Sequence, residues 1–128
     1  MMILKNNLVY ICSPLSAPTE AEIKENMRKA ARYTRIVSGH FGCRAIAPHS
    51  FLPEYLDDRI PEERQAALDF GLSILQISKA VVVCGNKISS GMAGEIKKAK
   101  ELEIPCYILL EYSCGLVIVK MIQKEGHA

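Results

Sequence analysis

Long apolar runs, an excess of one charge and paired cysteines are all absent from this sequence of 128 residues. No stretch approaches the roughly 20 apolar residues of a membrane-spanning helix, so we expect no membrane partner. The net charge of +2, without a run of like charge, gives no reason to expect a nucleic-acid partner. Only Lys5 precedes a brief apolar run near the N-terminus and no small-residue cleavage site follows, so we expect no signal peptide.

Cysteine and histidine are present, but without the spacing of a metal site. The five cysteines are odd in number and include no Cys-x-x-Cys pair. Most lie in strand-like runs, which is typical of reduced thiols that serve as small core residues in a cytoplasmic protein. The three histidines, His40, His49 and His127, are scattered along the chain, so we expect no zinc or other metal. We expect no cofactor either.

The order of apolar and helical patterns predicts the fold. The length predicts one domain over 1–128, and 49% apolar with 23% charged residues is ordinary for a soluble protein. Strand-like runs alternate with helical patterns, the strands at 8–13, 43–47, 80–84 and 106–111 and the helices at 19–42, 61–78 and 92–103. Strands that are apolar throughout indicate a parallel sheet with helices on both faces. Segment 116–121 fits either a fifth strand or a closing helix.

The helix expected at 61–78 is apolar nearly all round. Asp69 carries the only charge between Gln65 and Ser78. A helix of this kind is normally buried on most of its sides. We therefore expect it to pack between the sheet and another subunit, which predicts a homo-oligomer, either a dimer or a larger assembly.

The segment 80–99 carries the strongest functional signal, because an apolar strand, a Ser/Gly turn and a helix containing Glu95 follow one another. The turn and the helix start direct free backbone N–H groups at one point, which suits an anion or a sugar hydroxyl. Glu95 falls within the apolar arc that includes Met92 and Ile96, where an unpaired carboxylate is costly to bury. This position favours a functional acid. The alternative is an acid that interacts with the helix dipole and reaches water.

The expected strand ends supply further candidates. Ligands of open parallel sheets bind beyond the carboxyl ends of the strands, where 10–16, His49 and 86–95 fall. His49 is a candidate for ligand contact or proton transfer, although a loop histidine more often has a plain surface or capping role. Tyr10 is either part of the site or a core residue whose hydroxyl reaches water. Arg64 either is solvated at the surface or binds a phosphate.

Several motifs along residues 8–109 occur together in one known family. They are Tyr10-Ile-Cys-Ser-Pro14, Glu25-Asn26, Ala47-Pro48-His49, Leu56-Asp-Asp58, Pro61-Glu-Glu-Arg64 and Ile88-Ser-Ser-Gly-Met-Ala-Gly-Glu-Ile96. The chain resembles small bacterial and phage proteins similar to nucleoside 2-deoxyribosyltransferases and deoxynucleotide N-glycosidases, most specifically through Ser90-Gly-Met-x-x-Glu95. The resemblance implies a flavodoxin-like α/β sandwich of three layers with a four- to five-stranded parallel sheet. It also implies dimers or larger oligomers with active sites near subunit interfaces.

The resemblance further implies roles for individual residues. In the characterised relatives a glutamate after the glycine turn attacks C1′ of a 2-deoxynucleoside and forms a covalent glycosyl-enzyme, and Glu95 occupies that position. The tyrosine that ends the first strand would orient this carboxylate, a role that falls to Tyr10. The loop after the first strand and the turn before the helix would hold the 5′ end of the sugar or its phosphate. These two segments comprise Ser13, Pro14, Leu15, Ser16, Ser89, Ser90, Gly91 and Met92.

One position departs from the family pattern. The relatives carry an aspartate that assists departure of the nucleobase, and the matching position here is Gly71. The nearest acid is Asp69, which lies about 200° away around the helix. Asp69 either takes over this catalytic role, or pairs with an arginine and leaves the chain without such assistance.

Two functions of different classes follow. The first is an enzyme that cleaves or transfers the N-glycosidic bond of a 2′-deoxynucleoside or its 5′-monophosphate through Glu95. The second is a catalytically weak module that binds a nucleotide or a nucleotide-derived signal in the same cleft. An accessory protein with a vestigial cleft, whose Ser-Ser-Gly turn only caps a helix, is a third alternative. In the first two cases the partner is a small nucleoside or nucleotide.

Overall fold

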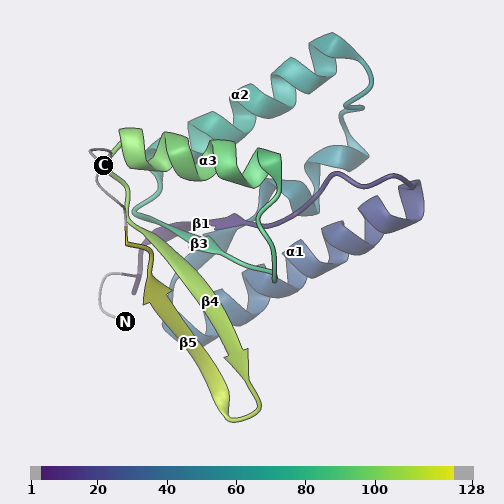
Figure 1. Cartoon of the computed structure of the whole chain (residues 1–128). Coiled ribbons are helices and arrows are strands. Elements are labelled where there is room, and N and C mark those ends of the chain that lie inside the picture. The colour runs from purple at the N-terminus through teal and green to yellow at the C-terminus, as the bar shows by residue number, and fades with distance from the viewer. Residues whose placement is uncertain (1–3, 123–128) are drawn as a thin grey trace.

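A five-stranded sheet in the order β2-β1-β3-β4-β5 runs through the protein, of which the computed structural model describes residues 4–122 (Figure 1). Its strands are β1 (Leu8–Cys12), β2 (Arg44–Ile46), β3 (Ala80–Val83), β4 (Cys106–Tyr112) and β5 (Gly115–Lys120). Strands β2, β1, β3 and β4 pair in parallel, and β5 pairs antiparallel with β4. The expected α/β fold on a parallel sheet is confirmed, with one antiparallel strand added at the edge.

The last strand decides between the two alternatives for segment 116–121. Only residues 113–114 connect β4 to β5, and so short a connection allows only an antiparallel neighbour. The segment therefore lies almost entirely in a strand rather than in a closing helix. Residues 1–3 and 123–128, which include His127, lie outside the described part, so the expected domain limits of 1–128 extend beyond it.

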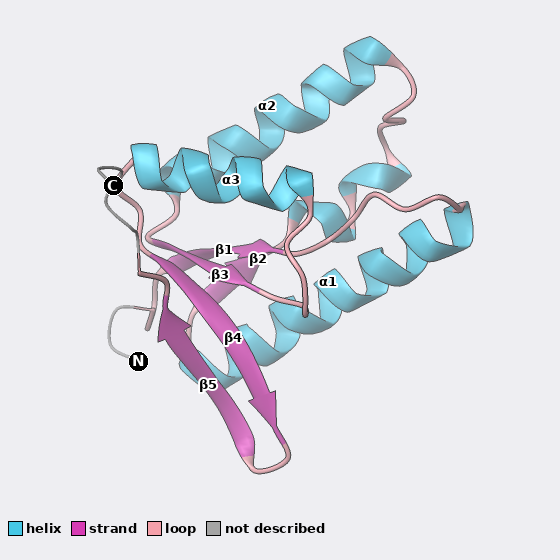
Figure 2. Ribbon diagram, viewed as in Figure 1, coloured by secondary structure: helices cyan, strands magenta, loops and turns pink. Residues whose placement is uncertain are grey.

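The helices form two layers on opposite faces of the sheet (Figures 1 and 2). They are α1 (Glu20–Phe41), α2 (Pro61–Ile77) and α3 (Ser90–Glu101), with two short 3₁₀ turns, η1 (Pro48–Ser50) and η2 (Leu52–Glu54). Helix α1 covers one face, and α2 and α3 cover the other, as the alternation of patterns predicts. None of the helices within residues 4–122 is long and apolar enough to cross a membrane.

Helix α1 begins and ends where the sequence supplies a cap. Thr19 Oγ1 accepts a hydrogen bond of 3.1 Å from the backbone N–H of Glu22, which confirms the helix start expected from this spacing. At the other end Gly42 adopts a left-handed φ of 65°, and its N–H donates to the carbonyl of Ser38. The buried side of the helix packs against the sheet through Ala30, Tyr33 and Val37.

The two faces of β1 belong to different layers, because successive side chains of a strand point to opposite sides. Val9 and Ile11 pack in the cluster beneath α1. Tyr10 and Cys12 lie in the opposite cluster, which also contains Met92, Ile96 and Ala99 of α3 and Leu75 of α2. Strand β1 therefore turns apolar side chains toward α1, and it turns the hydroxyl of Tyr10 and the thiol of Cys12 toward α2 and α3.

Helix α2 is less buried in this single chain than its composition predicts. Leu75 is its only buried residue, whereas Leu68, Phe70 and Ile77 are 55%, 38% and 64% exposed. Leu68 lines a pocket between α2 and the Tyr10 side of the sheet, whereas Phe70 and Ile77 lie on the opposite side of the helix. The expectation of a well-buried helix is therefore wrong for the isolated protomer.

Two glycines near the end of α1 offer a matched test of its cap. Gly42→Ala should lower the free energy of unfolding by about 1 kcal/mol, because alanine is strained at a φ of 65°. Gly39→Ala should raise it by about 0.5–1 kcal/mol, because Gly39 lies inside the helix with open space around it. Urea denaturation of both variants beside the wild type measures the two changes. Loss of stability in both would contradict the assigned helix end.

Candidate active site

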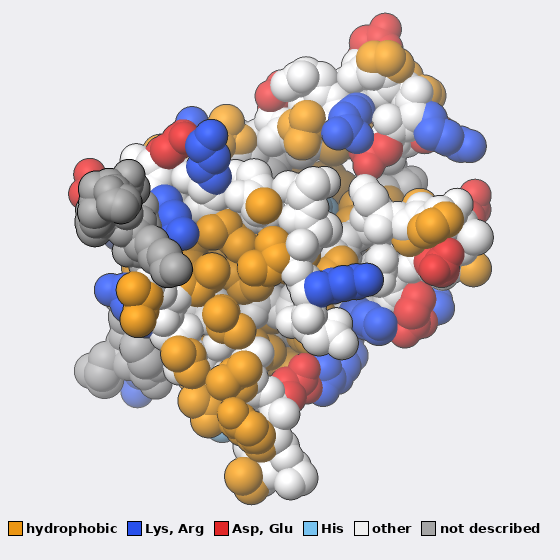
Figure 3. All heavy atoms as spheres, viewed as in Figure 1, with side chains coloured by type: hydrophobic (Ala, Val, Ile, Leu, Met, Phe, Trp, Pro, Cys, Tyr) orange, Lys and Arg blue, Asp and Glu red, His pale blue; other side chains and the backbone are white. Residues whose placement is uncertain are grey.

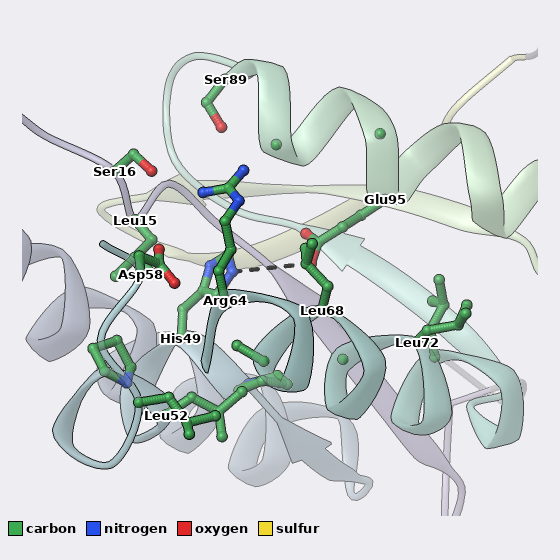
Figure 4. Close-up of a pocket in the computed structure, with 18 of the residues that line it drawn as sticks. Leu15, Ser16, His49, Leu52, Asp58, Arg64, Leu68, Leu72, Ser89 and Glu95 are labelled. Carbon is green, nitrogen blue, oxygen red and sulfur yellow. Dashed lines mark ion pairs between the residues drawn. The ribbon is translucent and has the colours of Figure 1, made fainter. Parts of the chain in front are cut away.

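A pocket of about 430 Å³ opens beyond the carboxyl ends of β1 and β3 (Figure 4). Four segments of the chain form its wall: the end of β1 with the loop after it, the 48–58 region with its two 3₁₀ turns, α2, and the start of α3. The location agrees with the expected binding position for a parallel sheet. Of the expected site residues, the pocket is lined by Tyr10, Leu15, Ser16, His49, Ser89, Ser90, Gly91 and Glu95.

Glu95 and Tyr10 are in direct contact. Tyr10 Oη donates a hydrogen bond of 2.5 Å to Glu95 Oε2, and the other carboxylate oxygen, Oε1, lies 3.3 Å from Cys12 Sγ. The tyrosine is 1% exposed, whereas the Glu95 side chain keeps 23% of its exposure through the pocket. The apolar arc of α3 therefore brings the carboxylate to a polar partner and to the pocket at once, rather than out to bulk water.

The protonation of Tyr10 follows from its surroundings. Burial, and then the negative charge of Glu95, raise the pKa of the Tyr10 hydroxyl far above its usual range. The hydroxyl therefore keeps its proton at neutral pH and serves Glu95 as a hydrogen-bond donor. A neutral hydroxyl that donates to Glu95 holds the carboxylate in place and carries no negative charge of its own.

His49 faces the same carboxylate from the opposite wall. Its Nδ1 lies 3.0 Å from the carbonyl oxygen of Ser13, and because a carbonyl only accepts, Nδ1 carries the proton of this bond. The second nitrogen, Nε2, is 4.0 Å from Glu95 Oε2, an ion pair whenever the imidazole is protonated (Figure 4). The histidine is thus held in a fixed orientation with one nitrogen toward the site.

The start of α3 forms another part of the wall. Ser89 is the N-cap, and its Oγ accepts a hydrogen bond of 3.2 Å from the backbone N–H of Met92. The Ser89 hydroxyl therefore serves to cap the helix. Ser90 and Gly91 line the pocket and are exposed, and they belong to the first helical turn, whose backbone N–H groups have no partner within the helix.

Four of the expected site residues do not line the pocket. Asp69 is exposed on α2, where it accepts a hydrogen bond of 2.9 Å from Gln65. Met92 is 1% exposed beneath the helix start. Ser13 is also 1% exposed, and its hydroxyl has no hydrogen-bond partner within the described residues. Pro14 packs toward Gly85.

Several residues that line the pocket were not assigned to the site from the sequence. Apolar side chains of the 48–58 region and of α2 form one wall, namely Leu52, Leu56, Leu68, Leu72 and Leu75, and the charges of Asp58 and Lys98 lie at its margin. The four-residue spacing of Leu68 and Leu72 marks a common helix face. That signal is hidden because α2 is apolar on its other sides as well. In the view of Figure 4, the side chain of Arg64 extends from α2 toward the side of the pocket where Ser89 lies.

Comparison with known proteins places this site in context. The model of a family described as "Domain of unknown function (DUF7768)" matches residues 7–109. No curated protein matches the chain. A solved 2-deoxyribosyltransferase from the psychrotolerant bacterium Bacillus psychrosaccharolyticus matches with a TM-score of 0.62 and 14% identity, over 79% of this chain and 70% of that one. The match confirms the flavodoxin-like fold and the resemblance to 2-deoxyribosyltransferases at the level of the fold.

The two serines at the start of α3 should differ in their effect on stability. Ser89→Ala should lower the free energy of unfolding by about 1 kcal/mol, because the hydroxyl of Ser89 caps the helix. Ser90→Ala should change it by less than about 0.5 kcal/mol, because its exposed side chain makes no such bond in the described residues. Chemical denaturation measures both. Equal losses would mean that the helix is capped differently.

Proposed function

We propose a function for this chain, which belongs to the family described as "Domain of unknown function (DUF7768)", from the geometry of its pocket. The protein cleaves or transfers the N-glycosidic bond of a 2′-deoxynucleoside or its 5′-monophosphate, with Glu95 as the nucleophile. The observation that carries this proposal is a carboxylate held in a pocket by a buried tyrosine, with Glu95 Oε2 at 2.5 Å from Tyr10 Oη. The fold match to a 2-deoxyribosyltransferase gives further support.

The reaction uses the carboxylate twice. An oxygen of Glu95 attacks C1′ of the sugar while the bond from C1′ to the base nitrogen breaks, and the electron pair of that bond leaves with the base, which takes up a proton. The sugar, positively charged in the transition state, is then held as an ester of Glu95. Water or a second base then attacks C1′, the bond from C1′ to the Glu95 oxygen breaks with its electron pair on the carboxylate, and the attacker gives its proton to the His49 ring that protonated the departing base. The choice between them decides whether the protein hydrolyses or transfers.

His49 is the group best placed to supply the proton for the departing base. Its Nδ1 is held by the Ser13 carbonyl and its Nε2 faces Glu95, so a protonated ring presents a donor to the pocket. Asp69 points away from the pocket, and Gly71, where the family resemblance implies an acid, has no side chain. We therefore leave Asp69 out of the proposed catalytic group.

The 5′ end of the sugar would lie at the start of α3. The backbone N–H groups of Ser90 and Gly91, the helix dipole and the hydroxyl of Ser16 all favour a hydroxyl or a phosphate there. Arg64 adds a positive charge and makes no ion pair within the described residues. These groups support a monophosphate as readily as a free nucleoside.

A second candidate function is a nucleotide-binding module that turns over slowly or not at all. The observation that favours it is the missing acid at Gly71, because a base that departs without a proton is a poor leaving group. Incubation with a panel of 2′-deoxynucleosides and their 5′-monophosphates, followed by chromatography for free base, separates the two functions. Binding without release of any base would favour the module.

Replacement of the proposed nucleophile should abolish the reaction. Glu95→Gln keeps the shape of the side chain but removes its negative charge, so we expect release of free base to fall by at least about 10³-fold. A slow substrate should leave a covalent sugar on the peptide that contains Glu95, detected as a mass shift. Glu101→Gln, an exposed change on the same helix, is the matched control and should keep full activity. Base release by the Glu95→Gln variant at the wild-type rate would refute the proposal.

We also propose that the protein is a homo-oligomer that associates through the outer face of α2. This face exposes Phe70 and Ile77, although the helix has an apolar composition. Figure 3 shows a second apolar surface along the hairpin of β4 and β5, where Val117 and Val119 are 46% and 45% exposed. The outer face of α2 is favoured because the same helix lines the pocket on its inner side, for example through Leu68, as expected for a site near a subunit interface.

A charge at the end of α2 should weaken this association. Ile77→Lys changes a residue that is 64% exposed and lies outside the pocket, so we expect an unchanged fold and a dissociation constant at least about tenfold higher. Light scattering over a range of micromolar concentrations measures the change. Val119→Lys places the same charge on the β4–β5 surface and should leave the assembly intact. A monomeric wild type would contradict the proposal, and dissociation by Val119→Lys alone would move the interface to the hairpin.

A further inference from the structure

Cys12 lies directly beneath the proposed nucleophile. It follows Tyr10 by two positions on β1, so both side chains point to the same face of the sheet. Its Sγ is 3.3 Å from Glu95 Oε1, while Tyr10 Oη bonds Oε2. The residue is 0% exposed and does not line the pocket. Cys12 therefore touches the carboxylate from behind and is out of reach of a bound substrate.

The thiol of Cys12 is a donor in this contact. Burial, and then the charge of Glu95, raise the pKa of the Cys12 thiol far above its usual range, so the sulfur keeps its proton. Two acceptors lie near it, Glu95 Oε1 at 3.3 Å and the carbonyl of Met92 at 3.8 Å. The carboxylate is both closer and charged, so it is the stronger acceptor. A protonated, buried thiol is not itself a nucleophile.

Resting on the proposed function, we propose that Cys12 is a positioning residue that fixes the rotation of the Glu95 carboxylate. The last torsion of a glutamate side chain is broad and nearly two-fold, so a single donor leaves the carboxylate plane loosely defined. Donors on both oxygens, the thiol on one and the Tyr10 hydroxyl on the other, hold that plane. The oxygen lone pairs that remain are then directed into the pocket, where C1′ of the sugar must approach.

Two substitutions at Cys12 separate positioning from simple packing. Cys12→Ala removes the donor, and we expect kcat for base release to fall about tenfold with KM unchanged, because the residue does not contact substrate. Cys12→Ser restores an O–H donor of similar size, and kcat should recover to within about threefold of wild type. A residue that only fills the core predicts the reverse order, because serine buries a hydroxyl where alanine does not. Cys84→Ala, at a buried thiol on the α1 side of the sheet, is the control and should keep kcat.

Infrared spectroscopy tests the contact itself without any substrate. The sulfhydryl stretching band of Cys12, assigned by its loss in Cys12→Ala, should lie at lower wavenumber than that of Cys84, because its acceptor is charged. In Glu95→Gln the acceptor is neutral, so the Cys12 band should move to higher wavenumber while the Cys84 band stays. A Cys12 band at the same wavenumber in wild type and in Glu95→Gln would overturn the inference, whatever activity the variants show.

The kinetic and spectroscopic results also distinguish this inference from the proposed function. If wild type releases base and Cys12→Ala keeps its kcat, or Cys12→Ser is no better than Cys12→Ala, the positioning role is refuted and the function of Glu95 stands. If wild type releases no base from any substrate, the proposed function fails and the positioning role fails with it. The band positions would then still report whether the thiol bonds the carboxylate.

Discussion

The hydrogen bond between Tyr10 and Glu95 is the contact on which the arrangement of the site depends. The tyrosine is buried, and a buried hydroxyl without a partner would cost about 1–3 kcal/mol. Glu95 provides that partner at 2.5 Å and so links β1 to α3. Because Glu95 lies in the second turn of α3, the same link holds the start of this helix at the rim of the pocket, with Ser90 and Gly91 toward it. One bond therefore sets the carboxylate and the backbone donors relative to each other.

The same tyrosine gives a physical account of Gly71. A Cβ built on this glycine would lie 3.4 Å from Tyr10 Oη, so the backbone of α2 passes close to the hydroxyl. A carboxyl group at position 71 would extend from that point toward Tyr10 and Glu95, and like charges at short range disfavour ionisation of one another. The glycine thus keeps a single carboxylate at this contact. The departure from the family pattern is consistent with a site organised around one acid, with His49 as its nearest basic neighbour.

The sequence predicts the fold better than it predicts the wall of the site. The strands are recognisable because parallel strands are apolar throughout, and Glu95 stands out as a carboxylate on an apolar helix face. The antiparallel β5 and the exposure of α2 depend on packing, which local patterns do not contain. A buried thiol such as Cys12 looks like a core residue until the structure places Glu95 against it. Helix geometry already separates Asp69 from position 71 by about 200°, and only the structure shows that it lies outside the pocket.

Strand β1 divides stability and chemistry between alternate residues. Val9 and Ile11 face α1 among apolar side chains, so their replacement alters the packing of the core. The hydrogen-bonding groups of the pocket stay the same. Tyr10 and Cys12 face the other way and contact both oxygens of Glu95, so even a change of one atom there alters a hydrogen bond. The pleat makes this separation possible, because a shift by one residue would exchange the two sets. The register of β1 against β3, Tyr10 beside Val81 and Cys12 beside Val83, is therefore as much a requirement of the site as of the sheet.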